Sequence, residues 1–109
     1  MITCTLENGD KPGLRHLVTG AIIVKDGKVL LEKRGTFRGK PILESGKWAI
    51  VGGFLDRDET IKEGIQREIF EETGLKVKGL KLLHINDNPF RPNDNGRQNV
   101  SVIFIAEPM

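Results

Sequence analysis

Runs of apolar residues separated by turn-forming pairs predict a chain built mainly of β-strands. Residues 17–25 and 28–34 are rich in aliphatic side chains, and the intervening Asp26-Gly27 is typical of a tight hairpin turn with positive φ. Further strands are predicted at residues 48–51, ending at Gly52-Gly53, and at residues 80–85 and 99–106. Both faces of the last strand are largely apolar, which favours a central position in its sheet.

One segment, residues 61–73, has the pattern of an amphipathic helix. Its three isoleucines recur every four residues and form a narrow apolar stripe. Thr60 and Glu63 have the spacing of a capping box, and Gly74 stands where a left-handed residue commonly ends a helix. Residues 35–47 are rich in turn formers and are predicted to form a loop. Several strands with a single evident helix predict an α/β (α+β) fold.

Length and charge narrow the class of protein. A chain of 109 residues suits one domain, and 17 basic against 15 acidic side chains give no case for a nucleic-acid partner. Cys4 is the only cysteine, so no intrachain disulfide is possible and a reducing compartment is favoured. The N-terminus lacks a signal-peptide pattern, and the apolar runs are too short to span a bilayer. We expect a cytoplasmic protein without a membrane partner.

Three glutamates on the predicted helix carry the strongest chemical signal. Glu68, Glu71 and Glu72 are spaced i, i+3 and i+4, so they project from one sector. That sector overlaps the isoleucine stripe, with Glu72 inside it, so part of it should face the body of the protein. Inward carboxylates need counter-charge, and the nearby Arg67 points about 100° away. Mg²⁺ or Mn²⁺ would meet that need, and a solvated acidic surface is the alternative.

The same segment resembles the signature of the Nudix hydrolase family. Residues 53–75 fit the pattern G-x5-E-x7-R-E-U-x-E-E-x-G-U, where U is a bulky aliphatic residue. The fixed positions are Gly53, Glu59, Arg67, Glu68, Glu71, Glu72 and Gly74. The resemblance extends over roughly residues 17–106. One departure is Val51, where the family commonly has proline, and it bears on loop stiffness more than on chemistry.

The resemblance implies a fold and a metal site. Nudix domains are α/β/α sandwiches around a mixed β-sheet, and the signature forms a loop, a helix and a second loop. By resemblance, the three glutamates at 68, 71 and 72 are the catalytic and metal-binding carboxylates for Mg²⁺ or Mn²⁺. The backbone carbonyl of Gly52 is implied as an additional ligand. Gly53 and Gly74 are implied to shape the signature, and Glu59 and Arg67 to hold its loop against the helix.

The activity implied is hydrolysis of a phosphoanhydride bond in a nucleoside diphosphate linked to another moiety. The metal activates a water, and a carboxylate takes its proton. Glu68, Glu71 and a glutamate outside the signature are the candidate bases. The run Gly-Gly-Phe-Leu-Asp at residues 52–56, with Pro89 and Pro92, favours a nucleotide sugar such as ADP-ribose. The alternatives are a housecleaning nucleoside triphosphate pyrophosphohydrolase and a non-catalytic Nudix-fold nucleotide-binding module, a class that generally loses signature glutamates.

Residues outside the signature give weaker signals. Arg34 ends the second predicted strand and is a candidate for binding substrate phosphate, with a solvated edge arginine as the alternative. Trp48 is predicted to lie in the core. His16 and His84 have no partner at ligand spacing and are assigned structural roles.

The family resemblance also bears on whether the chain holds all the elements of the domain. Nudix domains usually continue with another strand and a helix, so residues 1–109 are expected to form a single domain that lacks its C-terminal helix. A final strand that is apolar on both faces should not meet water. We therefore expect an outside helix, or a second subunit in a homodimer, to cover Val102 and Phe104 or the opposite side at Ile103 and Ile105.

Overall fold

The computed structural model describes residues 1–33, 36–37, 40–41, 46–92 and 94–109. Arg34 and most of the predicted loop at 35–47 therefore lie outside the described residues. Two short strands within that loop, β6 (Thr36–Phe37) and β7 (Lys40–Pro41), pair with each other.

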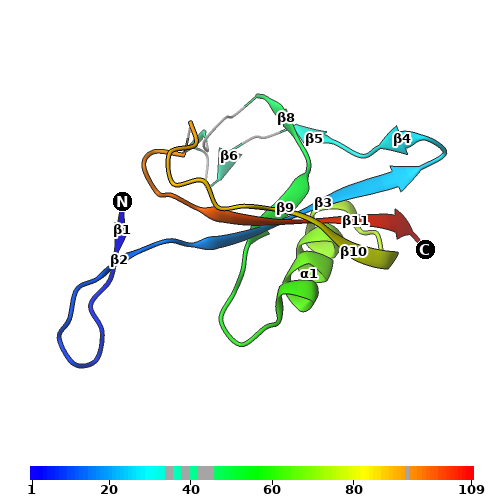
Figure 1. Ribbon diagram of the computed structural model, residues 1–109. Coiled ribbons are helices and arrows are strands. Elements are labelled where there is room, and N and C mark those ends of the chain that lie inside the picture. The colour runs from blue at the N-terminus through cyan, green and yellow to red at the C-terminus, as the bar shows by residue number, and fades with distance from the viewer. Residues whose placement is uncertain (34–35, 38–39, 42–45, 93) are drawn as a thin grey trace.

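A mixed five-stranded sheet forms the centre of the molecule (Figure 1). Its order is β10 (Val77–Asn86), β11 (Val100–Pro108), β3 (Leu17–Lys25) and β4 (Lys28–Val29), and β9 (Val51–Phe54) also pairs with β3. Strands β3 and β11 are parallel, and the other pairs are antiparallel. The predicted α+β class is confirmed. The prediction of a central last strand is also confirmed, because β11 lies between β10 and β3.

Two short ladders lie outside this sheet. Strand β1 (Ile2–Thr3) pairs with β2 (Gly13–Leu14), and β5 (Glu32–Lys33) pairs with β8 (Trp48–Ala49). The prediction that Trp48 lies in the core is wrong, since its exposed fraction is 67%. The physical reason is its position on β8, which pairs with β5 rather than joining the central sheet.

The hairpin after β3 has the predicted turn but not the predicted second strand. Asp26 and Gly27 have φ angles of 53° and 74°, as a two-residue type I′ turn requires. The N–H of Leu30 still donates to Ile23 O at 2.9 Å, and pairing with β3 then ends. The chain next runs as β5 beside β8, so the continuous strand predicted at 28–34 is instead two short strands with different partners.

Strand β9 continues through the two glycines, where the prediction ended it. Gly52 lies opposite Gly20 of β3, and a Cβ on Gly52 would stand 2.0 Å from the carbonyl oxygen of Thr19. Real Cβ atoms do not approach a backbone oxygen so closely, so only glycine allows β9 to approach β3 at this position.

Helix α1 (Ile61–Thr73) has the predicted bounds and both predicted caps. Thr60 Oγ1 accepts from the Glu63 N–H at 3.1 Å, and Glu63 Oε1 accepts from the Thr60 N–H at 3.0 Å. At the other end, Gly74 has a φ of 74° and donates its N–H to Phe70 O at 2.8 Å. These contacts satisfy backbone groups that a helix leaves unpaired at its ends. This helix of 13 residues, the only one in the described part of the chain, is not long and apolar enough to cross a membrane.

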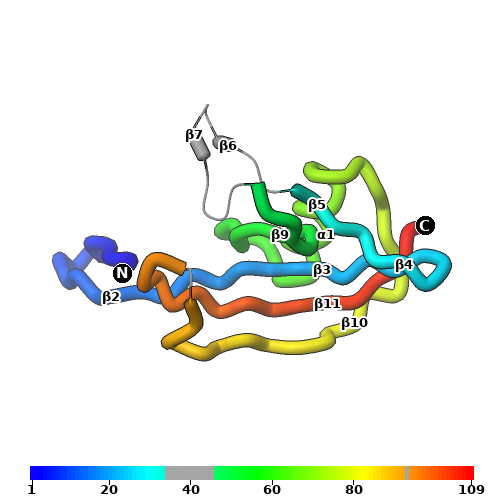
Figure 2. Tube along the Cα trace, turned by 90° about the horizontal axis from the view of Figure 1, so that it is seen from above, coloured from blue at the N-terminus to red at the C-terminus, as the bar shows by residue number. Residues whose placement is uncertain are grey.

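The core lies between α1 and one face of the sheet, on the side of β9 and β3 (Figure 2). Its fully or nearly buried members are Ala21, Ile23, Val51, Ile65, Ile69, Val102 and Phe104. Of the two faces expected to need outside cover, the one with Val102 and Phe104 has both of these side chains buried within the chain. Their face is covered within the chain, by the isoleucines of α1 and by Val77 and Leu80 of β10.

The opposite face of β11 is only half covered. Ile103 and Ile105 are half-buried, and the Cδ1 atoms of Ile50 and Ile103 lie over Gly20, where a Cβ would stand 3.0 Å from each. On the other face, the edge strand β10 exposes about half of Leu82 and Ile85, at 57% and 49%, and these residues pair with Phe104 and Val102. The expected additional cover, by a helix or a homodimer partner, stays a prediction.

The capping box gives a stability prediction. Thr60→Ala removes the side-chain acceptor of the Glu63 N–H, so we expect the free energy of unfolding to fall by about 1 kcal/mol. Urea unfolding followed by circular dichroism measures this change. Thr5→Ala is the matched control, because Thr5 is exposed in an irregular segment and should change stability by less than about 0.5 kcal/mol. Equal stability of the two variants would contradict the capping role of Thr60.

Candidate catalytic and metal site

The glycine pair of β9 opens a notch into which the helix places a carboxylate. A Cβ on Gly53 would stand 2.5 Å from Cδ of Glu68 and 2.5 Å from its Oε1. The Glu68 carboxylate therefore lies directly against the backbone of Gly53, and its side chain is only 14% exposed. Burial raises the pKa of Glu68, and the neighbouring Arg67 opposes that rise. A side chain at position 53 would therefore displace the Glu68 carboxylate from this placement.

The loop before α1 is tied to the helix by a bidentate ion pair. Arg67 donates from Nε to Glu59 Oε2 at 2.9 Å and from Nη2 to Glu59 Oε1 at 2.8 Å. The Asp56 N–H also donates to Glu59 Oε1, at 2.8 Å. Arg67 and then the Asp56 amide lower the pKa of Glu59 to about 2. Gly64 leaves the room for this pair, since a Cβ there would stand 2.9 Å from Glu59 Oε1.

Arg67 also contacts two of the three glutamates. Its Nη1 donates to Glu68 Oε1 at 3.0 Å and to Glu71 Oε2 at 3.1 Å. The expectation that Arg67 points away from these carboxylates is wrong. The direction of its Cα–Cβ bond does not fix the guanidinium, because the intervening side chain is long and flexible. Arg67 therefore supplies part of the counter-charge that the sequence pattern assigned to a cation alone.

Glu72 has a different environment. Its Oε2 accepts from the Gly52 N–H at 3.2 Å, and the side chain of Glu32 on β5 is near enough to act on the pKa of its carboxyl. The residue as a whole is exposed, yet the carboxyl lies among atoms that partly exclude water. This desolvation, followed by the contact with Glu32, raises the pKa of Glu72 to about 8.

Glu68 and Glu72 differ in how far they are enclosed. The helical pattern places Glu72 inside the apolar stripe and Glu68 just beside it, and in the structure Glu68 enters the glycine notch whereas Glu72 as a whole residue is exposed. Sequence reasoning missed Glu32 entirely. An available signal was the placement of an acidic residue directly after the aliphatic run at residues 29–31.

The fit to a divalent cation can be judged from the donor atoms. Within the described ranges, no three His, Cys, Asp or Glu side chains are gathered around one point at ligand spacing. Two of the three signature glutamates, Glu68 and Glu71, instead accept hydrogen bonds from one nitrogen of Arg67. Two carboxyl groups in contact, as Glu72 and Glu32 are, need either a shared proton or a cation. Oxygen donors of this kind, next to the backbone of Gly52, fit a hard divalent ion.

Other predicted residues are placed as follows. Arg34 lies outside the described residues. His16 is not isolated, since its ring stacks on Phe54 with centroids 4.3 Å apart and its Nε2 lies 3.3 Å from Leu55 O. It therefore connects the start of β3 to the loop before α1.

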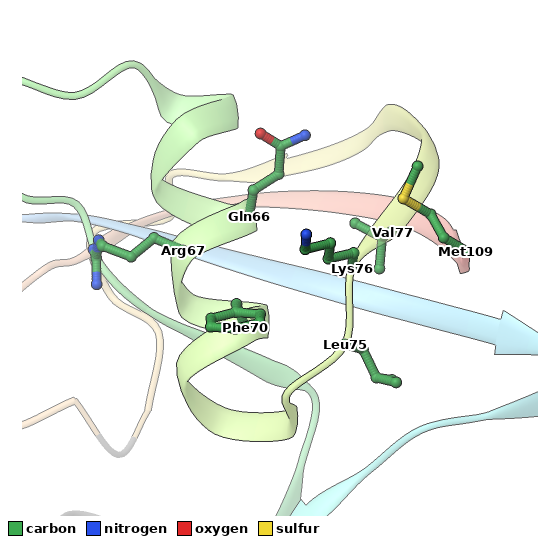
Figure 3. Close-up of a pocket in the computed structure, with 7 residues that line it drawn as sticks. All are labelled: Gln66, Arg67, Phe70, Leu75, Lys76, Val77 and Met109. Atoms are coloured by element: carbon green, nitrogen blue, oxygen red, sulfur yellow. The ribbon is translucent and has the colours of Figure 1, made fainter.

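A mainly apolar cavity of about 490 Å³ lies beside α1 and is separate from the glutamates (Figure 3). It is lined by Gln66, Arg67, Phe70, Leu75, Lys76, Val77 and Met109. The guanidinium of Arg67 points away from Lys76 and Met109, towards the ion pairs described above. The cavity contains none of the three glutamates, so we do not assign the chemistry to it.

Comparison with known proteins identifies the family of this chain. Residues 14–108 match the NUDIX domain. An ADP-ribose pyrophosphatase from Methanocaldococcus jannaschii is 41% identical over 86 residues, which are 79% of this chain and 47% of that protein. The chain thus spans about half the length of this curated relative.

Two solved structures share the fold. A MutT NUDIX hydrolase from Burkholderia pseudomallei has 31% identity and a TM-score of 0.72, with 88% of this chain and 73% of that chain covered. A bifunctional NMN adenylyltransferase/ADP ribose pyrophosphatase from Francisella tularensis, complexed with AMP and a manganese ion, has 26% identity and a TM-score of 0.69. That match covers 87% of this chain and 28% of the other. The matched region contains the mixed sheet, the glycine pair and the glutamate helix, and the chain therefore belongs to the NUDIX domain family.

Proposed function

We propose that this chain hydrolyses a phosphoanhydride bond in a nucleoside diphosphate linked to another group, in a reaction that depends on Mg²⁺ or Mn²⁺. The observation that carries the proposal is the placement of two helix carboxylates against the glycine pair of β9. Glu68 lies over Gly53, and Glu72 accepts from the Gly52 N–H. The family signature supports the same reading, because all its fixed residues are present between positions 53 and 75.

The metal would be held by Glu68, Glu71 and Glu72, with the carbonyl of Gly52 as an additional ligand. When bound, it would polarise a phosphoryl oxygen and lower the pKa of a water. Glu71, with 56% of its side chain exposed, stands at the solvent side of the group. When the metal binds, Arg67 would either keep its contacts with Glu68 and Glu71 beside the ion or lose them. Its ion pair with Glu59 would hold the guanidinium in place in either case.

The chain supplies a positioned proton acceptor. A general base must be held within hydrogen-bonding reach of the attacking water. Glu68 is the first candidate, because Arg67 holds one carboxylate oxygen and the carboxylate lies against the Gly53 backbone. Glu71 is the second candidate, since the same Arg67 nitrogen contacts it. The Glu59–Arg67 pair acts as positioning machinery by holding the loop against α1.

ADP-ribose is the substrate we propose to test first. The archaeal relative with 41% identity is an ADP-ribose pyrophosphatase, and the Francisella protein was solved with AMP, the nucleotide that hydrolysis of ADP-ribose would release. Cleavage would yield a nucleoside monophosphate and a phosphorylated remainder. A nucleoside triphosphate is the second candidate, on the similarity to the MutT protein. The intact set of signature glutamates argues against a binding module without catalysis.

The first prediction concerns the metal and the substrate together. The chain, incubated with ADP-ribose and Mg²⁺ or Mn²⁺, should release AMP, and excess EDTA should abolish the release until metal is restored. Product separation by ion-exchange chromatography measures this. Nucleoside triphosphates run in parallel decide between the two substrate classes. Full turnover in excess EDTA would contradict the proposed dependence of the reaction on a metal.

The second prediction concerns Glu72. Glu72→Gln keeps the shape of the side chain but removes a ligand charge, so kcat should fall by at least about a hundredfold while the fold is retained. Glu63→Gln is the matched control on the same helix. It affects only the capping box, so it should cost at most about 1 kcal/mol of stability and leave kcat unchanged. A Glu72→Gln variant with near wild-type kcat would remove Glu72 from the site.

The third prediction is a pH dependence of stability without metal. The folded state raises the pKa of Glu72 from 4.5 to about 8, so between these values the folded chain binds more protons than the unfolded chain. This contribution is complete below about pH 4.5 and is lost as pH rises through about 8. The Tm of the metal-free chain should therefore fall over this range, and the Glu72→Gln variant should show a smaller fall. Identical pH profiles for the two proteins would contradict the described environment of Glu72.

A further inference from the structure

An exposed aromatic ring stands on the connection between β10 and β11. Phe90 is 85% exposed, compared with 67% for Trp48 and 55% for Phe70. A phenylalanine in this position buries almost none of its ring within the chain, so it contributes little to the core. The flat face of the ring is therefore free to contact a ligand.

The backbone that carries Phe90 is held by side chains. Asn88 Oδ1 accepts from the Phe90 N–H at 3.0 Å, which is a local turn of the kind asparagine favours. Arg15 closes the two ends of the connection, since it donates from Nε to Gln98 O at 2.7 Å and from Nη2 to Asp87 O. A ring presented from a backbone already fixed in this way loses less entropy when it binds a ligand.

A neighbouring contact shows which side of the sheet this ring is on. Arg91 follows Phe90 and donates from Nη1 to Ser101 Oγ at 2.7 Å. Ser101 faces away from α1, because its neighbour Val102 is buried on the α1 side and successive residues of a strand alternate. Figure 1 shows the connection on this side of the sheet, where β5 and β8 also lie.

The register of the sheet relates this position to the glycine pair. Ser101 pairs with Val18, and Val18 pairs with Phe54, the residue after Gly53. Two strand spacings therefore separate Ser101 from Phe54, which is about 10 Å. Strand β9 runs from the side of β5 and β8 to the side of α1 (Figure 1). A nucleotide with its phosphates at the glycine pair can extend across β3 and β11 and bring its base to Phe90.

From this placement we propose that Phe90 stacks on the base of the nucleotide substrate. The inference rests on the proposed hydrolysis of a nucleotide and adds to it a subsite for the nucleoside. Stacking uses the planar face that every base has, so it tolerates different bases. Phe90 therefore supplies affinity for a nucleoside rather than choice among bases, and it takes no part in cleavage of the phosphoanhydride bond.

The experiment measures binding and turnover separately on the full chain. Etheno-AMP, a fluorescent analogue of AMP, has no anhydride bond to cleave, so its Kd is measured by fluorescence titration with Mg²⁺ present. Hydrolysis of ADP-ribose, or of a nucleoside triphosphate in its place, gives kcat and KM.

Phe90→Leu keeps an apolar side chain but removes the ring. The Kd for etheno-AMP and the KM should both rise roughly five- to a hundredfold, the range found when a stacking ring is lost. Because the residue does not act in the chemical step, kcat should stay within about twofold of the wild-type value. Phe90→Trp keeps a planar ring and should retain the wild-type Kd and KM.

Two further variants complete the comparison. Met109→Ala is the matched control, since Met109 is 79% exposed and follows the other end of β11. It should leave the Kd and KM unchanged. Trp48→Leu removes the other strongly exposed ring and should also leave the Kd for etheno-AMP unchanged. The Tm of each variant, recorded by circular dichroism, should match that of the wild type, because all three side chains are exposed.

The outcomes separate the subsite from the function. Unchanged Kd and KM in Phe90→Leu would overturn the stacking role and leave the proposed hydrolysis intact. A loss of affinity in Trp48→Leu or Met109→Ala as large as that in Phe90→Leu would also overturn the stacking role. A wild-type chain that binds etheno-AMP through Phe90 but cleaves no nucleotide would keep the subsite and overturn the function. A wild-type chain that does neither would overturn both.

Discussion

The close approach of β9 to its neighbours is the constraint on which the candidate site depends. Gly52 has no room for a Cβ beside the backbone of β3, and Gly53 has none beside the carboxylate of Glu68. The first glycine sets how closely β9 packs in the sheet, and the second sets how closely α1 can bring an acidic side chain to it. The positions of Glu68 and Glu72 follow from these two contacts, because α1 packs on the same strands through Ile65 and Ile69.

Arg67 links this backbone geometry to the charges. It closes the loop before α1 through Glu59 and reaches two glutamates on its own helix through a single nitrogen. One guanidinium thus stabilises the loop and partly neutralises the acidic group. Glu72 lies outside those ion pairs and takes its environment from Gly52 and Glu32. The three signature glutamates of α1 are therefore divided into a pair held by arginine and one, Glu72, that interacts with the strands.

Sequence reasoning succeeded where local chemistry decides the structure. The bounds of α1 follow from Thr60, Glu63 and Gly74, and the first hairpin turn follows from Asp26-Gly27, because each motif acts over a few residues. It failed where side chains from distant segments meet. The reach of Arg67 and the exposure of Trp48 depend on tertiary partners that periodicity does not encode. The contact of Glu32 with Glu72 likewise depends on the pairing of β5 with β8, which the apolar run at 28–34 concealed.

The parallel pairing of β3 with β11 has a consequence for how the domain forms. It joins Leu17 to Val100, so within the central sheet the strand nearest the N-terminus completes its ladder only with the one furthest along the described chain. Contacts so distant in sequence close slowly, because the intervening chain loses its freedom before the pairing stabilises it. Val102 and Phe104 also supply part of the surface on which α1 packs. The nascent chain therefore holds an unfinished core until residues 100–108 have left the ribosome, and its apolar strands are open to wrong partners during that interval.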